Sequence, residues 1–344
     1  MSAKPVEKPR RKPMRHWKAV RWVFLLGGLG LLVYLIRQVG LRSLVDHATR
    51  LGWTFLLILA VYAGLHVLRT LSWKVCLGAD SSKLSLGSGI SVWLAGESIS
   101  HLSFGWSGDA FRATVLSPRI SIARGLSALL VARMAYLYAS LVVTTAGVVL
   151  GLIVLPSLGP LQEILALGAL LLGALLLLPF GLAKRLNREF RPLHDWLERR
   201  DPRSLLGRIH HFYHTLIADL EKAFVQDRAT FARLLGINLL ASLAGVVEIY
   251  LVLHALEPQT TLTTAIIVEA GSKLISLFAF FVPGNIGVRE AGMVVLLQPF
   301  GLAASMGVTL ALVRRARAIF WVGVGALLMF ASGLRPAARP EANE

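Results

Sequence analysis

The stretch FFVPGNIGVREAG, residues 280–292, interrupts an otherwise apolar part of the chain. Two runs flank it, at 265–282 and 293–312, and both are apolar enough to cross a membrane. Backbone polar groups in hydrocarbon need internal partners, so such runs normally stay helical. Pro283, Gly284 and Gly287 break the helix, because proline lacks a donor and glycine favours other backbone angles. An interrupted membrane helix is therefore expected here.

The break carries polar side chains at Asn285, Arg289 and Glu290. Irregular backbone at membrane depth survives only where protein buries it or where it lines a wet cavity. One interpretation is therefore a binding site inside the membrane. The other is an ordinary loop at the membrane surface with both charges solvated, because proline–glycine turns between helices are common. Spacing alone does not choose between the two.

Composition predicts an all-α, polytopic helical membrane protein. The chain has 344 residues, of which 55% are hydrophobic and 16% charged. Several runs reach the roughly 20 apolar residues that a spanning helix needs. We expect about eight spans, some of them interrupted or re-entrant. The expected organisation is a basic cytoplasmic tail at 1–19, a single transmembrane domain at 20–333 with a cytoplasmic amphipathic connector at 184–233, and a C-terminal tail at 334–344.

The net charge of +17 comes mainly from the N-terminal tail and from segments between the expected spans. This distribution follows the positive-inside bias, so it argues against a nucleic-acid partner and places both termini in the cytoplasm. The expected location is the plasma (inner) membrane of a bacterial or archaeal type of cell. The single cysteine, Cys76, excludes an internal disulfide and a multi-cysteine metal site. We expect no metal and no cofactor.

A second unusual region lies at 84–113, which is too polar for a lipid-exposed span and too apolar for a plain loop. A re-entrant helix followed by a turn at Gly105 and Gly108 fits it best. Glu97 lies on this helix, and Asp109 and Arg112 follow the turn with a spacing that allows them to pair. The alternative is an amphipathic surface helix with a solvated ion pair.

The two regions resemble each other. Each runs from small residues through an apolar turn and glycines to an acid with an arginine: Asp109 with Arg112, and Glu290 with Arg289. Transporters are often built from two halves whose interrupted segments mark the binding site. We therefore expect an internal repeat of two halves.

Other charged residues leave alternatives open. Glu248 lies within an expected span, and Glu269 and Lys273 lie four apart on the next one; their roles are either functional or structural. Arg314 and its neighbours sit in the middle of the last apolar stretch, so either they face a wet interior or that span begins later. Three histidines at 210–214 fall on an expected amphipathic helix without acidic or cysteine partners, which favours interfacial histidines over a metal site.

The second motif resembles the flippase-like family, also described as the transmembrane region of lysylphosphatidylglycerol synthases. That family shows a Pro-Gly turn, then Gly-Val-Arg-Glu and a small residue, then an arginine in a late helix, as at 283–291 and Arg314 here. An upstream family motif, Gly-Glu-x-x-Arg, is matched by 108–112 with Asp109 in place of glutamate. The usual preceding proline is absent from 104–107, which departs from the family pattern at the first turn.

The resemblance implies a lipid-handling role, such as moving a phospholipid or a polyprenyl-linked lipid between leaflets. It does not imply lysyl transfer, because the soluble aminoacyl-transferase domain of the synthases is not in this sequence. The leading hypothesis is therefore a lipid flippase without enzymatic activity, in which arginines hold a lipid phosphate and carboxylates neutralise them in the empty state. The residues assigned to the lipid are Glu97, Asp109, Arg112, Asn285, Arg289, Glu290 and Arg314.

Two other hypotheses remain. A membrane enzyme acting on a lipid headgroup could use Asp109 and Glu290 as acid and base, although no nucleophile, phosphate-binding loop or paired-aspartate metal motif accompanies them. A non-transporting scaffold of a lipid-synthesis complex is the third. The expected ligand is a membrane lipid with an anionic headgroup, and a homodimer or a lipid-biosynthesis partner is left open.

Overall fold

The computed structural model describes Arg37 and residues 41–102, 107–155, 168–174, 205–278 and 287–334. These residues form helices and the turns between them, and none of them lies in a strand. The all-helical membrane fold is therefore confirmed. Within the expected transmembrane domain, residues 20–36 lie outside the described residues, and between 156 and 204 only 168–174 is described, which is helical.

The helices of the first half surround the region 84–113. They are α2 (Leu41–Leu51), α3 (Thr54–Leu77), α4 (Leu86–Leu102), α5 (Ser107–Leu116) and α6 (Ile122–Val154). The region predicted as a re-entrant helix and a turn is a hairpin of two short helices, α4 and α5. Neither helix is long enough to cross a bilayer, because spanning takes about 20 residues.

The second half repeats this pattern of lengths. After α9 (Leu205–Glu221) come α10 (Arg228–Leu256), α11 (Leu262–Phe278), α12 (Val288–Leu297) and α13 (Ala304–Ala331). The short pair α11 and α12 is the counterpart of α4 and α5. Three helices in the described residues are long and apolar enough to span a membrane, at Thr54–Lys83, Ile122–Val154 and Arg228–Leu256. The last helix begins at Ala304, so its three central arginines lie well inside it.

Local chemistry explains several helix starts. The Ser121 side chain accepts a hydrogen bond from the Arg124 N–H before α6, and Asp227 accepts one from the Thr230 N–H before α10. Before α12, Gly287 has φ +79°, which L side chains rarely adopt. The Glu290 carboxylate reaches back and accepts the Gly287 N–H at 2.7 Å. The predicted break at Gly287 is thus present.

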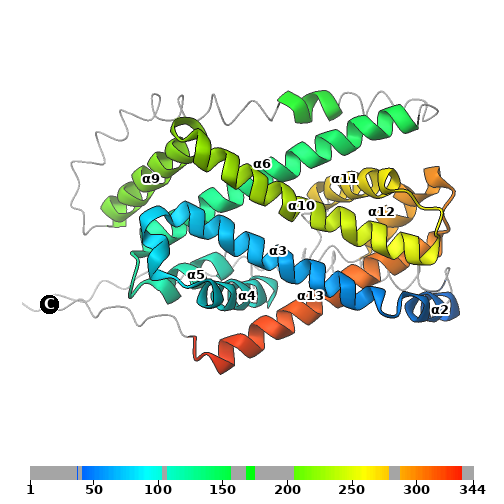
Figure 1. Cartoon of the computed structure of the whole chain (residues 1–344), viewed down its shortest axis with the longest axis horizontal. Helices are drawn as coiled ribbons and strands as arrows, with labels where there is room; N and C mark the ends of the chain where they lie inside the picture. The colour runs from blue at the N-terminus through cyan, green and yellow to red at the C-terminus, as the bar shows by residue number, and fades with distance from the viewer. Residues whose placement is uncertain are drawn as a thin grey trace, which may run out of the picture.

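Figure 1 shows the internal repeat as an arrangement in space. The helices α3 and α10 lie side by side in the centre and run in opposite directions, with α4 and α5 near one end of this pair and α11 and α12 near the other. Each long closing helix packs against both hairpins: α6 contacts α5 and α11, and α13 contacts α12 and α4. Opposite directions of equivalent helices make this an inverted repeat.

An acid–arginine pair occupies the same helical positions in both halves. Asp109 is the third residue of α5, and its Oδ2 lies 3.1 Å from Nη1 of Arg133, the twelfth residue of α6. Glu290 is the third residue of α12, and its Oε1 lies 2.7 Å from Nε of Arg315, the twelfth residue of α13. The match in both partners supports a repeat far more strongly than the short sequence similarity does.

Glycines allow close contact between each long closing helix and the opposite hairpin. A side chain at Gly147 of α6 would come within 2.6 Å of Cβ of Ala270 on α11. A side chain at Gly325 of α13 would overlap the Leu94 carbonyl and the Ser98 hydroxyl on α4. Each long helix therefore touches the first helix of the opposite hairpin backbone to backbone, as small residues permit in membranes.

The apolar core lies between α3 and α10. Ile58, Ile249, Val252 and Leu253 are fully buried there. Large apolar side chains also point outward, and Leu327 is 70% exposed. An outward apolar surface is expected where lipid rather than water is the surrounding solvent.

Replacing Gly325 by alanine should destabilise the protein. The added methyl group would overlap backbone of α4, and overpacking of this kind costs about 1–3 kcal/mol. Gly323→Ala is the matched control, because no described atom lies within 4 Å of a side chain there. That control should leave stability unchanged or raise it by about 0.5–1 kcal/mol. Thermal unfolding of the purified variants in detergent compares them, and equal melting temperatures would contradict the contact.

Removing the cation of the second acid–arginine pair should cost more than removing that of the first. Glu290 is fully buried, so Arg315→Met leaves an uncompensated charge, at about 3 kcal/mol. Arg133→Met should cost less, because Arg133 is 40% exposed and Asp109 keeps Arg112 as a partner. Adding Glu290→Gln to Arg315→Met should recover stability. Chemical denaturation in detergent measures all four proteins, and a larger loss for Arg133→Met would refute the assignment.

Candidate functional site

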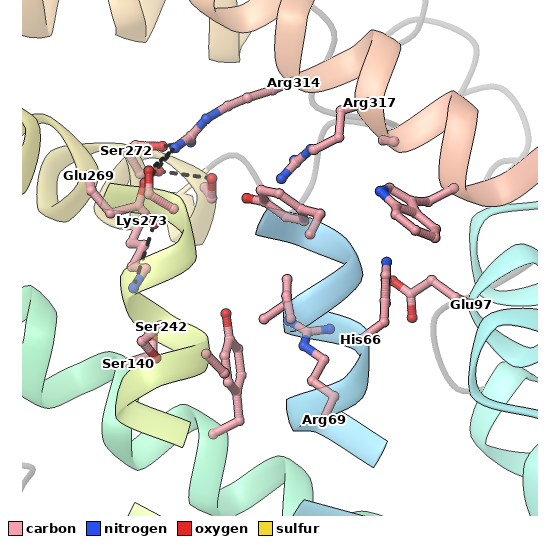
Figure 2. A pocket seen from close by; sticks show the side chains of 18 of the residues that line it. His66, Arg69, Glu97, Ser140, Ser242, Glu269, Ser272, Lys273, Arg314 and Arg317 are labelled. Atoms are coloured by element: carbon pink, nitrogen blue, oxygen red, sulfur yellow. Dashed lines mark hydrogen bonds and ion pairs between the residues drawn. The ribbon is translucent and has the colours of Figure 1, made fainter. Parts of the chain in front are cut away.

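A cavity of about 490 Å³ lies between the two halves of the repeat. Side chains from both hairpins and from all four long helices line it. Figure 2 shows Glu97 entering from α4, His66 and Arg69 from α3, Glu269 and Lys273 from α11, and Arg314 and Arg317 from α13. The repeat therefore places a polar chamber within a bundle of apolar helices.

The described lining holds more basic than acidic side chains. Five are lysine or arginine and two are carboxylates. The basic ones are Arg69, Lys273, Arg289, Arg314 and Arg317, and the acidic ones are Glu97 and Glu269. Charges in a low-dielectric interior interact strongly and need partners. An excess of cations therefore makes the chamber a place for an anion.

Arg314 is the most heavily paired cation of the chamber. Its Nη2 donates to Glu269 at 2.5 Å, its Nη1 donates to the Ser272 hydroxyl at 2.8 Å, and its Nε lies 3.1 Å from Glu248. Lys273 lies 3.6 Å from the other oxygen of Glu269. Arg314 thus connects α13 to α10 and α11. Of the two interpretations of Arg314, the structure supports a position facing the interior rather than a later start of the last span.

Glu248 is fully buried and bridges two arginines. Besides Arg314, it lies 3.2 Å from Nε of Arg317 and accepts a hydrogen bond from the Tyr62 hydroxyl at 3.0 Å. The Arg317 guanidinium sits 3.4 Å from the centre of the Tyr62 ring, in a cation–π contact. Glu248 therefore has a structural role, because it connects α3, α10 and α13.

Arg112 lies in a separate, smaller cavity of about 60 Å³ that adjoins the chamber. Its Nη1 donates to Asp109 at 2.5 Å and its Nη2 to Glu97 at 3.1 Å, while its guanidinium lies 4.1 Å from the centre of the Trp93 ring. The predicted pairing of Asp109 with Arg112 is present. Only 2% of the Arg112 side chain is exposed, so this arginine is sealed by its own partners.

Arg289 is held much more loosely than Arg112. Its Nη2 donates to the Ser276 hydroxyl at a long 3.4 Å, and its Nε has no partner in the described part of the chain. The adjacent Glu290 does not pair with it. Glu290 instead binds Arg315 and caps α12, because its side chain points away from the chamber toward α13.

The structure brings three of the predicted lipid-binding residues into the chamber, namely Glu97, Arg289 and Arg314. Asp109 and Arg112 lie in the adjoining cavity, which shares Glu97 with the chamber. Glu290 is not among the described lining residues of either cavity. Asn285, Gly105, Pro283 and Gly284 lie outside the described residues, and Gly108 is the second residue of α5, where a side chain would overlap Gly96.

Sequence reasoning did not assign several lining residues to the site. Arg69 and Arg317 belong to it, together with Glu269 and Lys273, whose roles were left open. Arg317 could have been found, because it lies three residues after Arg314 and so shares a helix face with it. Arg69 carried no such signal, since an arginine near the end of a span usually reaches the interface. Within the described ranges no group of three or more metal-binding side chains occurs.

Comparison with known proteins identifies the family of this chain. A family model described as the lysylphosphatidylglycerol synthase TM region matches residues 21–326. No curated protein and no solved structure matched the chain. The family match spans both hairpins and the chamber, and it fits a membrane protein that acts on lipids. The chain therefore belongs to the lysylphosphatidylglycerol synthase TM-region family.

Proposed function

We propose that this protein is a flippase that moves a lipid with an anionic headgroup between the two leaflets of a membrane. The observation that carries the proposal is the chamber at the centre of the repeat, with five basic side chains and two carboxylates in its described lining. Guanidinium groups bind phosphate oxygens through charge-assisted hydrogen bonds. A chamber of this kind suits a lipid headgroup in transit.

The carboxylates support the proposal because they act as internal substitutes for the headgroup. Glu269 occupies Arg314 and Lys273, so these cations stay paired when no lipid is bound. A lipid phosphate entering the chamber would compete for the same donors. Binding then exchanges one set of charge contacts for another, which keeps the cost of an empty chamber moderate.

The inverted repeat supports movement between leaflets. In transporters with such repeats the substrate site lies between the halves near the bilayer midplane, and one half moves against the other around it. Here the chamber is lined from both halves, and α13 contacts hairpins of both. Equivalent motions of the two hairpins would open the chamber to one side and then to the other.

The proposal also covers the membrane in which the protein lies, the orientation of its termini and the energy source for transport. Lysine and arginine concentrate at the N-terminus and at 184–208, which favours a plasma (inner) membrane with cytoplasmic termini. The ligand would be a membrane lipid. Transport would be passive, ion-coupled or driven by a partner protein, since the sequence contains no nucleotide-binding loop.

Arg289→Ala should reduce lipid movement by about 10-fold or more, because a charge-assisted hydrogen bond contributes about 1.5–3 kcal/mol. Arg289→Lys should keep part of the activity, since it retains the charge but loses the planar donor pair. The measurement is the rate at which fluorescent phosphatidylglycerol in vesicles containing the purified protein becomes accessible to an external quencher.

Arg119→Ala is the control for that experiment, because Arg119 is exposed and lies outside the chamber. Each variant must elute and melt like the wild type, so that a loss of folding is not mistaken for a loss of transport. Wild-type rates for Arg289→Ala would refute the proposal. Mass spectrometry of the vesicle lipids tests the enzymatic alternative, which requires chemically altered headgroups.

A further inference from the structure

Two of the five chamber cations lack a carboxylate partner. Arg314, Arg317 and Lys273 share Glu248 and Glu269. In the part of the chain that the structure describes, neither Arg69 nor Arg289 has a carboxylate within ion-pair distance. These two arginines therefore contribute most of the excess positive charge of the chamber.

Both of these arginines also keep an unused donor. The Nε atoms of Arg69 and Arg289 are buried and have no hydrogen-bond partner among the described residues. The Arg69 guanidinium lies 4.5 Å from the centre of the Tyr136 ring, has a side-chain hydrogen bond with Tyr136 and is attracted by Glu97 from beyond ion-pair distance, and Arg289 has only its long bond to Ser276. Leaving a buried charged donor unsatisfied is costly. The two sites are therefore incomplete without an acceptor from outside the described helices.

The segments that join the helices of each hairpin cannot supply the missing charge. Residues 103–106 read SFGW and residues 279–286 read AFFVPGNI, so neither contains aspartate or glutamate. Whatever neutralises Arg69 and Arg289 must therefore come from a bound anion or from a more distant part of the chain.

The two arginines belong to different halves of the repeat. Arg69 lies on α3 beside Glu97 and Tyr136, at the end of the chamber that adjoins the smaller cavity. Arg289 lies on α12 beside Ser276, which is on α11. Figure 2 shows Arg69 and Arg314 reaching into the chamber from opposite sides. Because Arg69 and Arg289 reach the chamber from helices of different halves, we expect each of them to need its own acceptor.

We propose that the ligand of this chamber is a lipid whose head carries two phosphoryl groups, one for Arg69 and one for Arg289. This inference rests on the proposed function and narrows its substrate. The volume of about 490 Å³ lies in the range of small-molecule sites, so two phosphoryl groups fit within it. Nη1 of Arg317 and Nζ of Lys273 belong to paired cations but have no hydrogen-bond partner among the described residues, so they could donate to the additional phosphate oxygens.

The test compares two ligands that differ by a single phosphoryl group. Farnesyl phosphate and farnesyl diphosphate are titrated into the purified full-length protein in detergent, and binding is measured by calorimetry. The wild type should bind the diphosphate about 10-fold more tightly or better, since the second group adds charge-assisted hydrogen bonds. Inorganic pyrophosphate forms a third arm, and it should bind much more weakly than farnesyl diphosphate.

Two variants locate the effect. Arg69→Gln and Arg289→Gln should each weaken diphosphate binding by about 10-fold and reduce the preference over the monophosphate. Arg228→Gln is the control, because Arg228 is exposed at the first residue of α10 and should leave both affinities unchanged. Thermal unfolding checks that each variant is folded, and the comparison of the two ligands on the wild type does not depend on any variant.

Equal wild-type affinities for the two farnesyl ligands would overturn the inference, as would unchanged preference in both arginine variants. If pyrophosphate bound as tightly as farnesyl diphosphate, the site would bind a free diphosphate, and the inference that its ligand is a lipid would be wrong. These outcomes are distinct from failure of the proposed function. The protein could move phosphatidylglycerol in an Arg289-dependent way and still bind the two farnesyl ligands equally well. That result would support the proposed flippase function and reject only the substrate with two phosphoryl groups.

Discussion

The fully buried carboxylate of Glu248 is the interaction on which the rest of the structure depends. Two arginines of α13 and the Tyr62 hydroxyl of α3 converge on it. A charge inside a membrane protein is expensive unless it is paired, and so is each arginine that it serves. Because this group neutralises cations in the middle of a long helix, α13 can pass through the bundle with a charged face. The chamber exists because that face is allowed to point inward.

The two halves share one frame but use it differently. In both, the third residue of the second hairpin helix is an acid that pairs with an arginine of the following long helix. In the first half an additional arginine, Arg112, is closed in by Asp109, Glu97 and Trp93. In the second half the extra arginine, Arg289, is left without a carboxylate. The repeat thus supplies the scaffold, and the departure from symmetry supplies the charge that a ligand can use.

Hydropathy and helix breakers predicted most of the fold, and they predicted the site only in part. The apolar runs predicted a bundle of membrane helices, and Pro283 and Gly287 marked the break before α12, because these signals act on local backbone. Pairing across helices left no such signal. Glu290 stands next to Arg289 in sequence yet pairs with Arg315, since neighbouring helical residues point in different directions. Arg69 was not predicted either, because its position in the chamber depends on how α3 packs against α4 and α6, and such packing leaves no local signal in the sequence.

Partial neutralisation is a physical requirement for a chamber that must both exist empty and bind a charged lipid. With a carboxylate for every cation, an anion would gain little, because each new contact would only replace an old one. With no carboxylates, five basic groups in a low-dielectric interior would repel one another and destabilise the bundle. The observed arrangement lies between these limits. Glu248 and Glu269 hold three cations in place, and the remaining two provide the net attraction that makes binding favourable.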